Sequence, residues 1–159
     1  LTSASSSSSS SSGSGGGGGG GESSSSFPPL DAKEEIQICL DNNQLNEAMM
    51  LALGSQDLEL VDWLCNKLNA EIIHEGKILS QTVLLCLLQQ LGYNLEINTL
   101  LKLTWLKEIS LNMDPNNSEI ISYVPKVVND LKTKVKAFQL TDAGRQVRTE
   151  LSLILRVLP

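Results

Sequence analysis

The clearest helical pattern in the chain runs from Glu119 to Phe138 and reads EIISYVPKVVNDLKTKVKAF. Its apolar residues recur at steps of three and four, a spacing that puts them on one side of an α-helix. They are Ile120, Val124, Val127, Leu131, Val135 and Phe138. Pro125 interrupts the stripe, and a proline at that place either kinks a helix or marks its true start. The segment therefore predicts a long amphipathic helix with both interpretations of Pro125 open.

The same helical spacing continues on both sides of this segment. Ser55 and Ser80 are expected N-caps, Gly54 and Gly92 are expected helix ends, and Thr141 or Asp142 is the expected cap of the last helix. Residues 69–79 are less clear and contain at most one helical turn, at 70–74. We expect helices at about residues 32–41, 45–53, 56–68, 81–91, 95–112, 119–138 and 143–158.

These expected helices define an all-α domain. Successive helices with broad apolar faces form either a closed bundle or an α-solenoid. Residues 81–91 are apolar all round and should form the most buried element, and residues 95–112 carry a wide apolar surface. Wide faces suit layered stacking, so we favour about seven antiparallel helices stacked as an armadillo- or HEAT-like solenoid.

The chain divides into two parts by composition. Residues 1–26 are almost entirely Ser and Gly, which predicts a disordered linker. Residues 27–159 are long enough for one domain, expected to be an α-helical protein-interaction domain. The longest apolar run, Val83 to Leu88, is far shorter than the roughly 20 residues that cross a bilayer. We therefore expect no membrane partner and a cytoplasmic location.

The residue types that carry chemistry do not form a recognisable site. His74 lies 9 residues after Cys65 and 12 before Cys86, and Cys39 precedes Cys65 by 26 residues. No close pair starts a metal site, and each cysteine lies on an apolar helical face. We expect reduced, buried thiols, no metal, no cofactor and no enzymatic activity.

Charge is distributed unevenly between the two halves. The net charge is −6, but residues 31–101 hold 11 acids and 3 bases, whereas residues 102–159 hold 6 acids and 9 bases. The acidic balance makes direct RNA binding unlikely for the whole chain. A local basic patch in the second half is still expected.

Two sets of side chains are candidates for partner binding. The basic set is Arg145, Arg148 and Arg156 on the last helix and Lys132 and Lys136 on the helix before it. Arginine recognises carboxylate or phosphate groups in a bidentate manner. Ordinary solvated charges, an acidic-peptide site and an RNA-backbone site remain open for this set. No aromatic residue is interleaved, which disfavours stacking on single-stranded RNA.

The second set is apolar. It comprises Met49, Met50, Leu51, Leu103 and Leu106, together with Trp63 and Trp105. Core packing is the favoured interpretation for all of them. The alternative is that some line a groove for a partner's amphipathic helix or short motif.

Four segments resemble a known family. They are 40–65 (LDNNQLNEAMMLALGSQDLELVDWLC), 80–92 (SQTVLLCLLQQLG), 100–115 (LLKLTWLKEISLNMDP) and 145–158 (RQVRTELSLILRVL). In this order they are similar to the C-terminal helical domain of the Hedls family, the enhancer-of-mRNA-decapping scaffolds. The resemblance covers about residues 30–158.

The resemblance implies a function that composition does not show. It implies a non-catalytic scaffold in mRNA decapping and 5′-to-3′ decay, located in cytoplasmic P-bodies. It also implies partners, namely the decapping enzyme, its activators or the decay exonuclease, bound through short linear motifs. Self-association is a further possibility, and an RNA-binding helical domain that uses the C-terminal basic face is the alternative function.

Overall fold

The computed structural model describes residues 31–75, 77–141 and 144–159. Over these ranges the chain forms seven α-helices and one short 3₁₀ helix, and no β-strand. The expected linker, residues 1–26, lies outside the described residues. The elements are α2 (Ala32–Asp41), α3 (Leu45–Gly54), α4 (Leu58–Lys67), η1 (Ala70–Ile73), α5 (Gln81–Leu91), α6 (Thr99–Asn112), α7 (Val124–Gln139) and α8 (Arg145–Val157).

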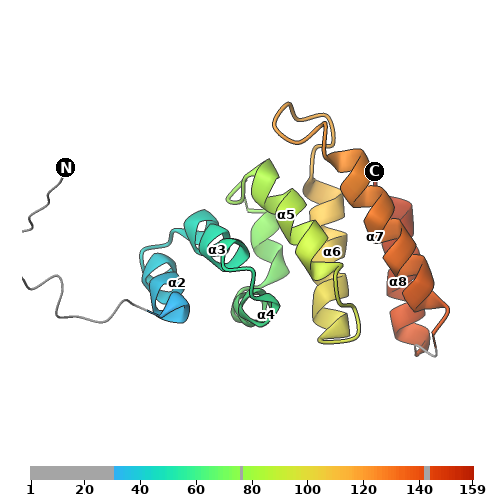
Figure 1. Cartoon of the computed structure of the whole chain (residues 1–159), viewed down its shortest axis with the longest axis horizontal. Helices are drawn as coiled ribbons and strands as arrows, with labels where there is room; N and C mark the ends of the chain where they lie inside the picture. The colour runs from blue at the N-terminus through green and yellow to red at the C-terminus, as the bar shows by residue number, and fades with distance from the viewer. Residues whose placement is uncertain (1–30, 76, 142–143) are drawn as a thin grey trace, which may run out of the picture.

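The helices stack in two layers. One layer holds α3, α5 and α7, and the other holds α4, α6 and α8, with each helix packed on the next within its layer. The pairs α3 with α4, α5 with α6 and α7 with α8 pack across the layers. Helix α2 packs on α3 at one end, and Figure 1 shows the stack running from there to α7 and α8. This is an α-solenoid, as the sequence predicted.

The core runs along the interface between the two layers. Helix α5 lies at its centre with six of its 11 residues buried, the largest share of any described helix. Trp105 of α6 is 1% exposed, and its indole N–H donates to the Cys65 carbonyl oxygen of α4 at 3.2 Å. Leu103 and Leu106 are fully buried. The expectation that these three α6 residues pack in the core is confirmed.

Of the two serines expected as N-caps, Ser80 caps its helix and Ser55 does not. Ser80 Oγ accepts from the Val83 N–H, and the Asp31 N–H donates to Glu34. Ser55, the expected cap of α4, instead ends α3 and donates to the Ala52 carbonyl oxygen at 2.7 Å. Asp57 caps α4, because its carboxylate, a stronger acceptor than a hydroxyl, receives the N–H groups of residues 59 and 60 at 3.0 and 3.4 Å.

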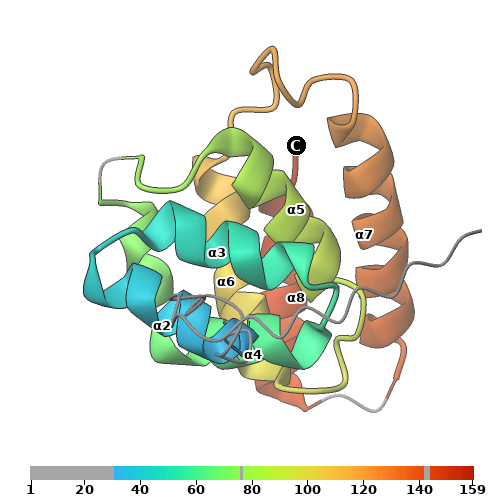
Figure 2. The ribbon, with the colours of Figure 1, turned by 60° about the vertical axis from the view of Figure 1, so that its left-hand side comes forward.

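The last three helices begin later than expected. Helix α6 starts at Thr99 rather than near residue 95, since Asn98 has left-handed backbone angles (φ 52°) that interrupt helical geometry. Helix α7 starts at Val124, with Pro125 in its first turn, so the proline marks the start and does not kink the helix. Helix α8 follows Gly144, so Thr141 does not cap it, and Asp142 lies outside the described residues. Figure 2 shows the loop that leads from α6 into α7.

Candidate binding surfaces

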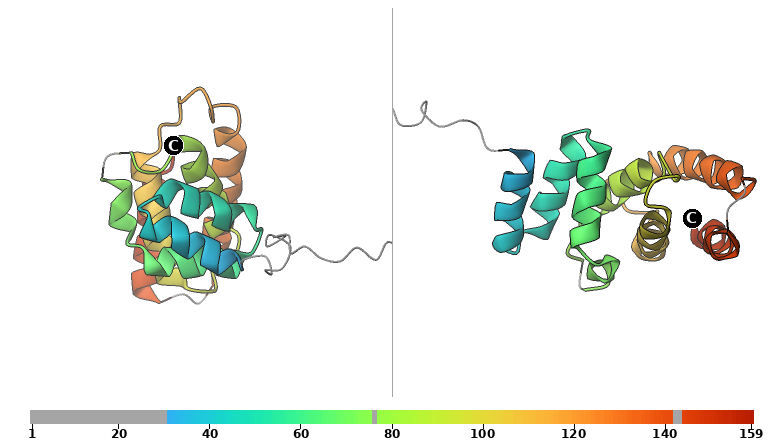
Figure 3. Two further views of the ribbon diagram at one scale, coloured as in Figure 1. Left: turned by 90° about the vertical axis from the view of Figure 1, so that its left-hand side faces the viewer. Right: turned by 90° about the horizontal axis from the view of Figure 1, so that it is seen from below.

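The basic residues predicted from sequence lie on one end of the solenoid. Arg145, Arg148 and Arg156 are exposed on α8, whose buried side carries Leu151 and Ile154. Helix α8 packs against α7, and together these two helices form the end opposite α2 (Figure 3).

The two lysines of this set differ. Lys136 of α7 is exposed. Lys132 is half-buried, and its amino group donates to the Pro159 carbonyl oxygen at 3.0 Å, so it fastens α7 to the end of α8. Glu150, the acidic residue of α8, pairs with Lys107 of α6 at 3.6 Å. We call Lys132, Lys136, Arg145, Arg148 and Arg156 the basic face.

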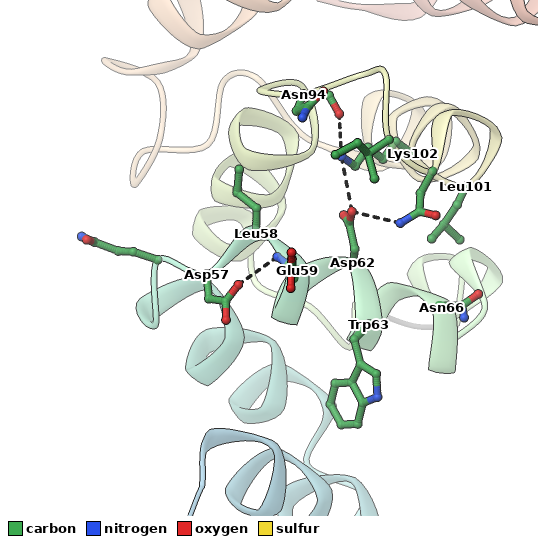
Figure 4. A pocket seen from close by; sticks show the side chains of 12 residues that line it. Asp57, Leu58, Glu59, Asp62, Trp63, Asn66, Asn94, Leu101 and Lys102 are labelled. Carbon is green, nitrogen blue, oxygen red and sulfur yellow. Dashed lines mark hydrogen bonds and ion pairs between the residues drawn. The ribbon is translucent and has the colours of Figure 1, made fainter.

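A groove between α4 and the start of α6 is the second candidate surface. It has a volume of about 910 Å³. Its lining comes from residues 56–66 on one side and from residues 94–102 on the other. Figure 4 shows α4 crossing the view with the α6 residues above it. The sequence did not predict this groove.

A buried ion pair joins the two sides of the groove. Lys102 of α6 is only 2% exposed, and its amino group lies 3.4 Å from the Asp62 carboxylate of α4. The same amino group donates to the Asn94 carbonyl oxygen at 2.5 Å, and the Asn98 amide donates to Asp62 at 3.2 Å. These bonds fix the loop before α6 against α4, so the groove is a built feature of the stack.

The rim of the groove combines acidic and apolar side chains. Asp57 and Glu59 are exposed at the start of α4, and neither forms an ion pair with another described residue. Ile97 is 55% exposed, and Leu101 is half-buried beside the Asp62–Lys102 pair. The groove therefore offers an apolar surface next to uncompensated negative charge.

Trp63 is among the lining residues and points from α4 toward α2 (Figure 4). Its side chain is half-buried, and the amino groups of Lys67 and Lys33 lie 4.8 and 5.6 Å from the centre of its ring. Lys67 also donates to Gln37 of α2 at 2.6 Å. The expected core position is thus met only in part, because Trp63 lies at the edge of the core between α2 and α4.

The expectation of core packing is also met only in part for Met49, Met50 and Leu51. Met49 is fully buried, whereas Met50 and Leu51 are 55% and 39% exposed. The core interpretation holds for Met49 and is wrong for the other two. Helix α3 turns one side to the core, and residues 50 and 51 fall on the other side.

The expectation of buried thiols holds for Cys65 only, because Cys39 and Cys86 are half-buried. Burial raises the pKa of the Cys65 thiol well above its usual range; the nearby Asp62 charge also raises it, and Lys102 opposes this. Burial also raises the pKa of Cys86. The imidazole of His74 pairs with the Glu108 carboxylate. Within residues 31–75, 77–141 and 144–159, no three His, Cys, Asp or Glu side chains gather where they would hold a metal ion.

None of the described helices combines the length and the hydropathy that a membrane crossing requires. What the described residues present is a two-layer helical stack with a basic face at one end and a groove along one layer. Extended surfaces of this kind define the α-solenoid class, whose members bind other macromolecules along the stack.

The family is shown by comparison with known proteins. The chain belongs to the family described as enhancer of mRNA-decapping protein 4, C-terminal, whose model matches residues 36–154. This confirms the resemblance noted in the sequence. The matched range begins in α2 and ends in α8.

Individual relatives agree with this assignment. The enhancer of mRNA-decapping protein 4 homolog of Drosophila melanogaster is 34% identical over 116 residues, which are 70% of this chain and 8% of that protein. The Danio rerio protein of the same name is 33% identical over 106 residues (65% and 8%), and the Homo sapiens protein 33% over 101 (62% and 7%). The chain thus spans under a tenth of the length of these relatives.

A solved structure shares the fold. The crystal structure of the conserved C-terminal region of Ge-1 matches with a TM-score of 0.70 at 24% identity, over 79% of this chain and 95% of that one. The two chains thus have the same arrangement of helices over most of their length.

Proposed function

We propose that this domain is a non-catalytic scaffold in mRNA decapping and 5′-to-3′ decay, and that it works in the cytoplasm and concentrates in P-bodies. The observation that carries the proposal is the family match over residues 36–154, which includes nearly the whole helical stack. The relatives carry the name enhancer of mRNA decapping, and a stack of helices with exposed faces supports binding to other proteins.

The partners we propose are the decapping enzyme, its activators or the decay exonuclease, bound through short linear motifs. The basic face is the proposed contact for acidic residues of such a motif, since arginine pairs well with carboxylates. A single short motif binds modestly, and a tethered scaffold gains affinity from several simultaneous contacts. Self-association of the domain would add to this effect.

The test reverses two charges of the basic face. We expect Arg145→Glu/Arg156→Glu to reduce co-precipitation of the decapping enzyme and recruitment to P-bodies about tenfold or more, because both carboxylates would repel an acidic motif. The matched control is Lys77→Glu/Lys126→Glu, which makes the same charge change at exposed positions outside the basic face. Circular dichroism should show unchanged helicity for both variants. Equal co-precipitation and recruitment of the two variants would remove the basic face from the proposal.

RNA is the alternative partner that the clustering of basic residues favours. Filter binding of a 20-nucleotide oligo(U) to the chain separates the two functions. A binding constant that falls steeply with salt, and that the Arg145→Glu/Arg156→Glu variant loses, would support RNA binding by counterion release. We expect no measurable binding at physiological salt, given the net charge of −6.

A further inference from the structure

We propose that the groove between α4 and α6 is a second docking site, for an extended segment of a partner protein that carries one large apolar side chain followed or preceded by a Lys or Arg. The inference rests on the proposed role of the domain as a protein-binding platform. It does not depend on the basic face, which lies on other helices and selects the opposite charge.

Charge complementarity assigns the basic residue of the partner. The lining contains three carboxylates, those of Asp57, Glu59 and Asp62, against the single amino group of Lys102. The ion pair between Asp62 and Lys102 cancels one charge of each sign. The carboxylates of Asp57 and Glu59 remain, both exposed at the start of α4. A partner cation that approaches this end of the groove would meet two carboxylates that form no ion pair with another described residue.

The same carboxylates exclude a phosphate-bearing partner. The start of a helix ordinarily attracts anions through its free N–H groups. In α4, the Asp57 carboxylate already accepts the N–H groups of Glu59 and Leu60. A phosphate placed there would lose these donors and face two like charges. The groove therefore favours a peptide over RNA.

The apolar part of the groove would bind the large apolar side chain of the partner, which we call the anchor. Ile97, in the loop before α6, leaves 55% of its surface in solvent although it lies inside a hollow, and Leu101, in the first turn of α6, is half-buried. A leucine-sized side chain that covers both would remove apolar surface from water, at about 25 cal/mol for each Å² covered. In Figure 4, Asp57 and Leu101 lie at opposite sides of the groove, so the anchor and the basic residue of the partner would be separated along it.

Amide side chains favour an extended backbone. Gln56 and Asn66 are exposed in the lining, and neither side chain makes a hydrogen bond to another described residue. Each amide offers both donors and an acceptor, which match the N–H and C=O groups of an extended peptide. A partner helix would satisfy its own backbone internally and leave these amides without a role. These two amides therefore fit an extended segment, whose backbone groups are free to bond with them.

The test uses a phage library of random 12-residue peptides, selected on the immobilised 159-residue chain. We expect enriched peptides with one Leu, Ile, Phe or Met and a Lys or Arg a few residues away from it. Synthetic copies of them should bind at least tenfold more weakly to Ile97→Asp and to Glu59→Lys. Both positions are exposed, so both variants should keep the fold, which circular dichroism checks.

Two matched control variants test whether weaker binding comes from the groove or from any change of charge on the surface. Leu100→Asp changes a neighbouring exposed residue of α6 outside the lining, and Glu47→Lys changes an exposed acid in the first turn of α3. Neither should weaken binding more than twofold. An acidic consensus, no enrichment, or equal losses in the control variants would overturn the proposal. The Arg145→Glu/Arg156→Glu variant should bind these peptides normally, so a failure of the groove and a failure of the basic face give different results.

Discussion

At the scale of single residues, the buried pair of Asp62 and Lys102 should contribute strongly to stability. The side chain of Lys102 is 3% exposed, and that of Asp62 is 11% exposed. Replacing Asp62 with Ala would leave a buried ammonium group with only the Asn94 carbonyl oxygen as partner. We expect a loss of about 3–5 kcal/mol in the free energy of unfolding, measured by urea denaturation.

Two variants control this prediction. Glu59→Ala removes an exposed carboxylate of the same helix and should change stability by less than about 0.5 kcal/mol. The double variant Asp62→Leu/Lys102→Met removes both charges and should recover most of the loss, because no unpaired charge stays buried. If Asp62→Ala is as stable as Glu59→Ala, the ion pair does not hold α6 against α4.

Two glycines at helix ends should respond in opposite directions to alanine. A Cβ atom on Gly92 would lie 2.5 Å from Leu131 Cδ1 of α7 and 3.2 Å from the Leu88 carbonyl oxygen of α5. Gly92→Ala should therefore cost about 1–3 kcal/mol through overpacking. A Cβ atom on Gly54 meets nothing within 4 Å, so Gly54→Ala should stabilise by about 0.5 kcal/mol. Thermal melts of both variants check the sign, and a stabilised Gly92→Ala would contradict the close packing.

At the scale of elements, Pro125 tests where α7 begins. In the first turn of a helix a proline removes no internal hydrogen bond. Pro125→Ala should therefore reduce stability by only about 0.4–1 kcal/mol, the entropy that the proline ring saves in the unfolded chain. Asp130→Pro places the same residue at an exposed position in the helix interior and should cost about 3 kcal/mol or more. Similar losses in the two variants, measured in urea, would mean that α7 begins before residue 124.

The helices themselves were predictable because their signals are local. The stripe from Ile120 to Phe138 and the apolar run of α5 each follow from the spacing of neighbouring residues. Helix ends were less predictable, since several residues compete for one cap. The sequence pattern indicated Ser55 as the cap of α4, but Gln56 has a positive φ of 57° and the helix begins after Asp57.

The groove was unpredictable for a different reason. Its two sides, near Asp62 and near Lys102, are about 40 residues apart in sequence and meet only because α4 and α6 stack in one layer. Nothing in the spacing of either segment marks that contact. The basic residues were recognisable because they recur along single helices, but their proposed role in binding depends on a partner that the sequence does not describe.

At the scale of the whole molecule, the stack predicts uneven stability along its length. Each helix packs mainly on its immediate neighbours, so stability in such a fold is close to a sum of local terms. Helix α2 is the end element of the described stack, packs on α3, and has one buried residue, Ile36. It should open more readily than the centre.

Truncating one buried side chain in α2 and one in α5 tests the prediction that α2 opens more readily than the centre. Ile36→Ala should make the amides of α2 exchange with solvent at least tenfold faster, because α2 has no other buried anchor, while the amides of α5 keep their protection. Leu87→Ala, at a fully buried position in α5, should instead speed exchange in α5 and in the helices packed on it, while α2, which exchanges through its own local opening, changes less. Hydrogen–deuterium exchange read by mass spectrometry measures both. Equal acceleration of α2 and α5 in Ile36→Ala would show that the domain unfolds as one unit, and the neighbour-by-neighbour description of its stability would then be wrong.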